Sequence, residues 1–167
     1  MNKAYWFCNS DNKTIYQRLE IVEGTVLACE GELKLCENGY HASFSAFDAL
    51  RHAMGSFLWL VEVSDEKVES GDKVAARWRR HVRRIDATPI LRKFAAIQAL
   101  SVAHRANLPP VVMEYLRDEA AGKDRSDIRA AAYSAAASAA SAASAAHSAA
   151  YSAARKMFDK MIEEAFK

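Results

Sequence analysis

The feature that most constrains this sequence is the stretch from Ala130 to Ala154. It holds 16 alanines and six serines, and it has no charged residue, glycine or proline. Alanine has the highest intrinsic helix propensity, and the serines recur at steps of three or four residues, which is the α-helical period. Ser126 is a suitable N-cap, and larger apolar residues return at helical spacing from Met157 onward. We therefore expect one long helix over residues 126–166.

A helix of this length has a smooth alanine side. About 40 residues at 1.5 Å each give a rod of about 60 Å, which is longer than a small domain covers. Small side chains allow another backbone to approach closely, so we expect a partner or a second copy of the chain to pack there, which would make a homodimer. The alternative is a solvated low-complexity helix. The interface residues that we predict are Tyr133, Ala139, Ala143, Ala146, His147 and Tyr151.

The same stretch is long enough to cross a membrane, but its composition opposes insertion. Alanine is nearly neutral for insertion, and the serines disfavour it, so we expect no membrane association. Residues 1–6 lack the apolar core of a signal peptide, which favours a cytoplasmic protein. The three cysteines leave one thiol unpaired in any disulfide scheme, as is usual in a reducing compartment.

The rest of the sequence predicts an α+β protein. Residues 1–86 should form a β-rich domain, a small antiparallel or mixed sheet with one short helix capped by Ser45. Its most continuous apolar strand is Phe57–Val63, and residues 73–85 should form one further long strand. Thr88-Pro89 is a typical helix start and marks the boundary. Residues 87–167 should be helical, with helices at about 89–106, 110–121 and 126–166.

A family resemblance rests on the motif Asn38-Gly39-Tyr40-His41-Ala42-Ser43. A helix with an Ala-Leu pair, a Leu-Val-Glu-Val strand (60–63) and a Gly-Asp-Lys-Val-Ala-Ala segment (71–76) follow it. Together, over about residues 5–86, they resemble an uncharacterised domain family encoded in phages and prophages, whose members often carry an alanine-rich tail. The resemblance implies a phage accessory protein. Such proteins commonly act on host machinery, including as anti-CRISPR or other anti-defence inhibitors.

The most distinctive charged segment is residues 77–84, with five arginines in eight residues. On a regular strand, Arg77, Arg79, His81 and Arg83 would share an exposed face, while Arg80 and Arg84 would join Trp78 on the other. Guanidinium groups suit phosphates and carboxylates, so this strand could bind nucleic acid or an acidic protein surface. The alternative is an edge strand that its charges protect from aggregation. The net charge of +2 favours a local contact over general DNA coating.

Metal and catalytic sites are weakly indicated. Cys29, Cys36 and His41, with Cys8, lack the spacing of zinc ligands, so we expect no metal and no other cofactor. His41 near Ser43 and Glu62 could form acid–base machinery, but no nucleophile elbow or phosphate loop accompanies them.

These observations favour a protein without catalysis that binds and inhibits a host protein or ribonucleoprotein defence complex, of the anti-CRISPR type. The first alternative is a nucleic-acid-binding accessory protein that uses the strand Arg77–Arg84. A small transferase or hydrolase centred on His41 is a more distant alternative.

Overall fold

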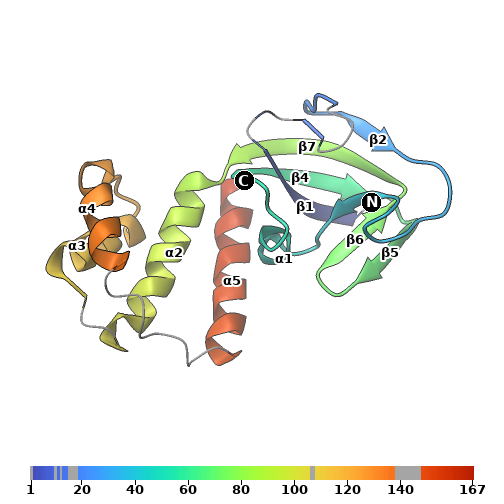
Figure 1. Cartoon of the computed structure of the whole chain (residues 1–167). Coiled ribbons are helices and arrows are strands. Elements are labelled where there is room, and N and C mark those ends of the chain that lie inside the picture. Colours follow the sequence, from blue (N-terminus) through green and yellow to red (C-terminus); the bar gives the residue numbers. More distant parts are fainter. Residues whose placement is uncertain (1, 10, 12, 15–18, 106–107, 138–147) are drawn as a thin grey trace. The chain divides into compact units, whose positions relative to one another are not determined.

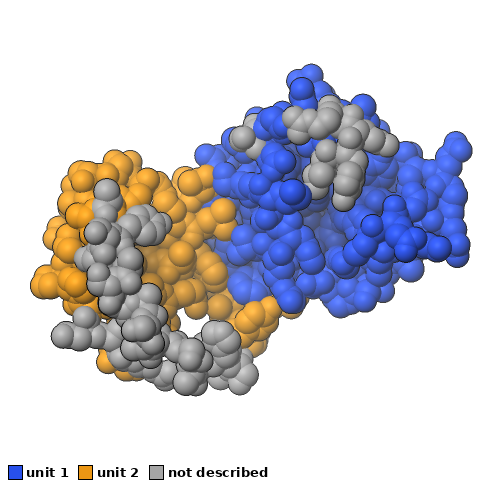
Figure 2. Space-filling model, in the orientation of Figure 1, with its two compact units in different colours: residues 1–87, 158–167 blue, residues 88–157 orange. Residues whose placement is uncertain are grey.

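The structure, a computed structural model, describes residues 2–9, 11, 13–14, 19–105, 108–137 and 148–167 (Figure 1). These residues form two compact units (Figure 2). Unit 1 comprises residues 1–87 and 158–167, and unit 2 comprises residues 88–157. The boundary after Ala87 lies one residue from the expected position, but the last ten residues group with unit 1 and not with the helical region.

Unit 1 contains two antiparallel sheets. The four-stranded sheet has the order β1 (Asn2–Cys8), β4 (Phe57–Val63), β7 (Trp78–Asp86) and β2 (Val26–Ala28). The three-stranded sheet has the order β3 (Tyr40–Ala42), β6 (Lys73–Ala76) and β5 (Lys67–Ser70). Tyr5 and Ser43 join β1 to the end of β3 through two backbone hydrogen bonds of 2.8 and 3.0 Å. The predicted α+β class with a small antiparallel sheet is confirmed.

The core of unit 1 contains inward-facing residues of both sheets. Trp59, Val61 and Val63 of β4 cluster with Ala42, Val74 and Ala76 of the smaller sheet, and all six are buried. Leu58, on the opposite face of β4, is also fully buried. Because both faces of β4 are covered, nearly every residue of the strand is apolar, which is the pattern noted in the sequence analysis.

The expected single strand over residues 73–85 is divided. β6 and β7 belong to different sheets, and Arg77 lies between them. The Arg77 amide donates to Ser64 Oγ and to the Glu66 carbonyl, at 3.0 Å each, one step beyond the last β5–β6 pair, and the next residue begins β7 in the larger sheet. The sequence analysis also missed β5, which pairs with β6 across a turn where Gly71 has a φ of 58°.

Residues 158–167 complete unit 1 through the short helix α1 (Ala46–Leu50). Asp159 lies in α5 (Ser148–Ala165), where its carboxylate accepts hydrogen bonds from Ser45 Oγ, at 2.9 and 3.0 Å, and from the Phe47 amide, at 2.9 Å. Phe158 is fully buried and lies edge-on to the ring of Phe47. A carboxylate at a helix start satisfies amides that have no partner within the helix. A residue 114 positions away thus caps α1.

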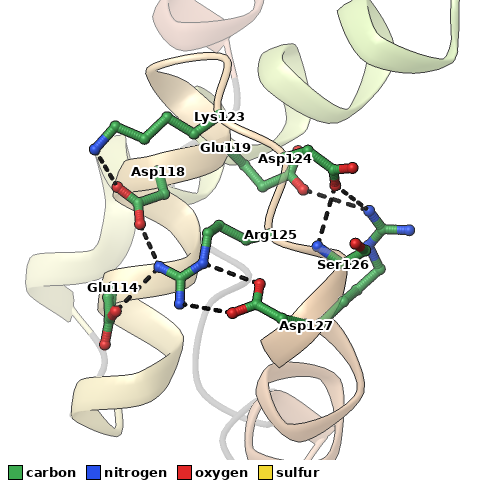
Figure 3. Close-up of polar contacts among 9 residues, drawn as sticks. Glu114, Asp118, Glu119, Lys123, Asp124, Arg125, Ser126 and Asp127 are labelled. Carbon is green, nitrogen blue, oxygen red and sulfur yellow. Dashed lines mark hydrogen bonds and ion pairs between the residues drawn. The ribbon is translucent and has the colours of Figure 1, made fainter.

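Unit 2 contains α2 (Thr88–Val102), a short 3₁₀ turn (Ala103–Arg105), α3 (Pro110–Ala120) and α4 (Ser126–Ala137). Arg125, just before α4, contacts three carboxylates at once, those of Glu114, Asp118 and Asp127 (Figure 3). A planar guanidinium can donate to several carboxylates because its five N–H groups point outward in one plane. These contacts join α3 to the start of α4.

The alanine-rich segment is only partly described. Tyr133 lies in α4, and Tyr151 lies in α5 with 46% of its surface exposed. Ala139, Ala143, Ala146 and His147 lie outside the described residues, so the predicted continuous rod, its interface and the homodimer stay predictions. No helix in the described part of the chain is both long enough and apolar enough to cross a membrane.

The Asp159 contact leads to a test of stability. We expect Asp159→Ala to lower the free energy of unfolding by about 1–2 kcal/mol, because the Phe47 amide and the Ser45 hydroxyl lose their acceptor. The measurement is urea unfolding followed by tryptophan fluorescence. The matched control is Glu164→Ala, which removes only an exposed ion pair with Lys160 and should change little. Equal unfolding midpoints for the two variants would contradict the capping role.

Candidate functional site

An irregularity in β7 decides where its arginines point. Val61 of β4 pairs with His81, whereas Leu60 pairs with Arg83, so Val82 is an extra residue in β7. Such a β-bulge shifts the alternation of side chains along the strand, and cross-strand partners lie on the same face. Arg79 and His81 therefore face the core with Val63 and Val61. The bulge places Arg83 on the opposite face, with Leu60.

The expectation that Arg77, Arg79, His81 and Arg83 share an exposed face is therefore wrong. Arg79 is only 3% exposed and His81 is fully buried. Arg77 lies before β7 and binds the Glu66 carboxylate and the carbonyls of Cys29 and Gly31. Arg83 donates to the Phe166 carbonyl at 2.8 Å.

The two remaining arginines also make contacts within unit 1. Arg80 Nη1 lies 3.5 Å from the Glu62 carboxylate, with half of the arginine side chain exposed. The Arg84 guanidinium lies 4.8 Å from the centre of the Phe57 ring, and Arg84 is exposed. The predicted binding role of the five arginines stays a prediction. Their exposure to solvent favours it for Arg80, Arg83 and Arg84 only.

Arg79 is a buried cation without a carboxylate partner among the described residues. Its guanidinium carbon lies 3.9 Å from the centre of the Trp6 ring and 5.7 Å from that of Tyr40. Its Nη1 donates to the His41 carbonyl, while its buried Nε has no hydrogen-bond partner. Burial lowers the pKa of Arg79 to about 9, so the group stays protonated at neutral pH. Charged groups buried in this way normally have an anionic partner.

Arg79 lines a cavity of about 450 Å³ in unit 1. The walls come from β1, β3, the end of α1 and the turn before β3, and they combine aromatic rings with polar groups. Besides Arg79, the aromatic and titratable side chains in the lining include those of Tyr5, Trp6, Tyr40, His41, His52 and Lys73. This combination of apolar walls and a few polar groups is typical of small-molecule sites.

His41 holds together two parts of the cavity wall. Its Nε2 accepts a hydrogen bond of 2.9 Å from the Cys36 amide, so the ring proton of the neutral form is on Nδ1. Burial lowers the pKa of His41, and the charges of Lys73, Arg79 and His52 lower it further. The ring is therefore neutral at pH 7, and its carbonyl, on the other side of the residue, orients Arg79.

The acid–base group considered from the sequence is only partly assembled. Ser43 lines the same cavity as His41, but it is nearly fully buried and its backbone pairs with Tyr5. Glu62 does not line the cavity and instead pairs with Arg80.

The described cysteines are all free thiols. Cys29 and Cys36 line the cavity, whereas Cys8 is buried in the core. Among the described residues, no group of three or more His, Cys, Asp or Glu side chains could hold a metal ion.

The sequence analysis missed several residues of this site. Trp6 was given no role, and Lys73 appeared only as the start of a predicted strand. Tyr40 lay in the motif of the family resemblance, but no role was assigned to it. One signal could have indicated a buried arginine. A central strand must bury some of its side chains, and five of the eight residues at 77–84 are arginines.

The second buried histidine predicts how stability depends on pH. Burial and the charge of Arg79 lower the pKa of His81 to about 4, although Nδ1 lies 3.1 Å from the Thr25 carbonyl. Above pH 6.5 neither the folded nor the unfolded state is protonated. Between about pH 6.5 and 4 only the unfolded state binds the proton, so stability falls as the pH falls. His41 acts in the same direction.

We expect His81 alone to remove about 3 kcal/mol of unfolding free energy between pH 7 and pH 4. The test is urea unfolding at several pH values. In His81→Leu the decline should be shallower, and the Thr25 carbonyl still accepts the backbone amide of residue 81 at 2.9 Å. The unfolding free energy of His81→Leu at pH 7.5, where His81 is neutral in both states, measures the effect of the substitution on packing alone. Parallel pH profiles for wild type and variant would contradict the assignment.

Comparison with protein families places this domain. A family described as "Domain of unknown function (DUF7666)" matches residues 2–93, which include every strand of unit 1 and the residues that line the cavity. Comparisons with curated proteins and with solved structures found no match. The family match covers more than half of the 167 residues, so the chain belongs to this family of unknown function.

Proposed function

We propose that unit 1 is a non-catalytic binding domain for a small organic anion, which occupies the cavity beside Arg79. The observation that carries the proposal is the buried guanidinium, which is 97% shielded from solvent and has no carboxylate partner among the described residues. An anion in the cavity would supply the missing counter-charge. The cavity volume of about 450 Å³ is within the usual range for small ligands, about 300–1,000 Å³.

The free donors of Arg79 favour a carboxylate. Nη1 is engaged by the His41 carbonyl, but Nε has no partner, and no hydrogen bond joins Nη2 to another described residue. The N–H groups of Nε and Nη2 are parallel in a guanidinium, and they match the two oxygens of a carboxylate. One ligand charge would also balance the one buried cation.

The walls favour a ligand with an apolar or aromatic body. Tyr5, Trp6, Phe7 and Tyr40 line the cavity together with two alanines. Aromatic walls supply large contact areas to a ligand ring. We therefore assign a small aromatic or aliphatic monocarboxylic acid as the class of ligand.

The test compares matched acids and amides. We expect acids such as benzoate and indole acetate to bind and to raise the thermal midpoint, while benzamide and indole acetamide do not, because only an ionised carboxylate pairs with Arg79. At ten times the dissociation constant, the bound acid should stabilise the fold by about 1.4 kcal/mol. Chemical shift changes in a titration followed by NMR provide a second measurement.

The variant Arg79→Met should abolish the preference for acids. It should also fold with a stability within about 1 kcal/mol of wild type, because it removes a buried charge that has no ionic partner. The control is Arg80→Met, whose side chain is half exposed and pairs with Glu62. Equal binding of acids and amides, or unchanged acid binding by Arg79→Met, would refute the proposal.

The second candidate function is the one that the phage resemblance implies, inhibition of a host defence complex of the anti-CRISPR type. The observation that supports it is the exposure of Arg80, Arg83 and Arg84 on β7. These three cations could contact an acidic protein surface, or nucleic acid in the alternative hypothesis.

For this candidate we expect replacement of Arg80, Arg83 and Arg84 by glutamate to weaken binding to a host complex about tenfold or more, because like charges would then face an acidic partner. Affinity capture from host lysate, followed by titration of the captured complex, measures the effect. A steep loss of wild-type binding with added salt, together with binding to a random duplex, would favour the nucleic-acid alternative. Unchanged affinity of the triple variant would exclude this surface.

A further inference from the structure

We infer that Cys36 is a nucleophilic thiol of the same cavity, placed to capture a small electrophile that carries a carboxylate. The carboxylate part of this inference rests on the proposed function, whereas the reactivity of the thiol does not. Three independent features of the structure lead to it: the backbone of Cys36, its contact with Lys73, and the unpaired guanidinium of Arg79 in the same cavity.

The backbone at Cys36 has an uncommon conformation. Its φ is 67°, and it is the only described residue other than glycine with a positive φ. This region costs a side-chain-bearing residue about 1–2 kcal/mol, and such residues gather at functional sites. The amide of Cys36 donates to His41 Nε2, and Asn38 fixes the turn by donating to the carbonyls of Glu30 and Glu32. The surrounding contacts thus hold the thiol in place.

The second feature is the electrostatic surroundings of the sulfur. Lys73 Nζ lies 2.9 Å from Cys36 Sγ, and the hydrogen bond to the sulfur is the main cause of the raised pKa of Lys73. A cationic neighbour at hydrogen-bonding distance from the sulfur is a common feature of reactive cysteines. Cys36 is also exposed, as a reactive thiol must be.

The other two cysteines lack this combination. Cys8 is buried, and burial raises the pKa of its thiol, which disfavours the thiolate. Cys29 is partly exposed, and its sulfur lies 3.5 Å from the Arg77 carbonyl. Its side chain also contacts that of Arg77, but the Arg77 guanidinium is already paired with the Glu66 carboxylate. Among the three thiols, only Cys36 has a lysine ammonium group within hydrogen-bonding distance of its sulfur.

The third feature points to the ligand. Cys36 and Arg79 line one cavity, and Arg79 is 97% buried with an unpartnered Nε. His41 connects the two, because its ring accepts the Cys36 amide while its carbonyl accepts Arg79 Nη1. A ligand whose carboxylate pairs with Arg79 would therefore lie in the same cavity as the Cys36 thiol, and the rest of the ligand could face that thiol.

The covalent step needs no oxidant or cofactor. The Cys36 thiolate attacks an electrophilic carbon of the ligand, a sulfur–carbon bond forms, and the bond from that carbon to the leaving group breaks. The leaving group departs with the electron pair, and the thiol proton has already gone to solvent. The product is a stoichiometric thioether adduct, so the step is compatible with a domain that does not turn over.

Iodoacetate and iodoacetamide are the matched probes for this step, because they differ only in the carboxylate. The full-length chain is treated with each reagent, and the alkylation rate of each cysteine is followed by peptide mass spectrometry. With iodoacetamide we expect Cys36 to react at least about tenfold faster than Cys29 and Cys8. The rate ratio of iodoacetate to iodoacetamide at Cys36 should exceed that of free glutathione by about tenfold.

Two variants separate the thiol from the anion site. Lys73→Met should slow both reagents at Cys36, whereas the control Lys67→Met, in the neighbouring strand β5, should slow neither. Arg79→Met should reduce the ratio of iodoacetate to iodoacetamide toward that of glutathione.

The outcomes distinguish the two proposals. If Cys36 reacts with iodoacetamide no faster than Cys29, or if Lys73→Met has no effect, the nucleophilic thiol is refuted whatever Arg79 does. If Cys36 is fast but shows no preference for iodoacetate, the assignment of a carboxylate-bearing electrophile is refuted, while the anion site of Arg79 is decided separately by the titration with matched acids and amides.

Discussion

Keeping the Arg79 guanidinium away from water, with no carboxylate beside it, constrains the whole interior of unit 1. The effective penalty for burying such an ion is several kcal/mol. The face of Trp6 and the His41 carbonyl offset part of that penalty, and they come from two different strands, β1 and β3. These strands meet at the Tyr5–Ser43 bridge, where the two sheets join. The cavity, its lining and the junction of the sheets therefore all surround one charge.

A single inserted residue in β7 gives its arginines different environments. If β7 alternated regularly through Val82, with no bulge, Arg83 would follow Arg79 and His81 onto the core face, and the interior would hold a second guanidinium. The bulge instead places Arg83 where the Phe166 carbonyl accepts its hydrogen bond. Bulges recur near functional sites because they redirect side chains without ending the strand. The same strand thus supplies a core histidine, a cavity cation and exposed charges.

The sequence predicts those elements whose cause is local. β4 was predicted with its exact bounds because both of its faces are apolar, and α3 lies between Pro110 and Gly122 as expected. The separation of Arg83 from Arg79 onto opposite faces could not be predicted, because nothing local marks the bulge at Val82. Nor could the contact between Cys36 and Lys73, which are 37 residues apart, or the capping of α1 by Asp159, since long-range contacts leave no periodic pattern.

The position of Asp159 in the chain has a consequence for biosynthesis. Unit 1 needs residues 158–167, but the 70 residues from 88 to 157 are translated between its two parts. At about 5–20 residues per second, the ribosome takes about 4–14 s to cover that distance. During this interval α1 has no Asp159 acceptor for Ser45 and Phe47, and the site later filled by Phe158 is open. The nascent β-rich domain must therefore persist as an incomplete intermediate, which the chain closes only after the helical unit has been made.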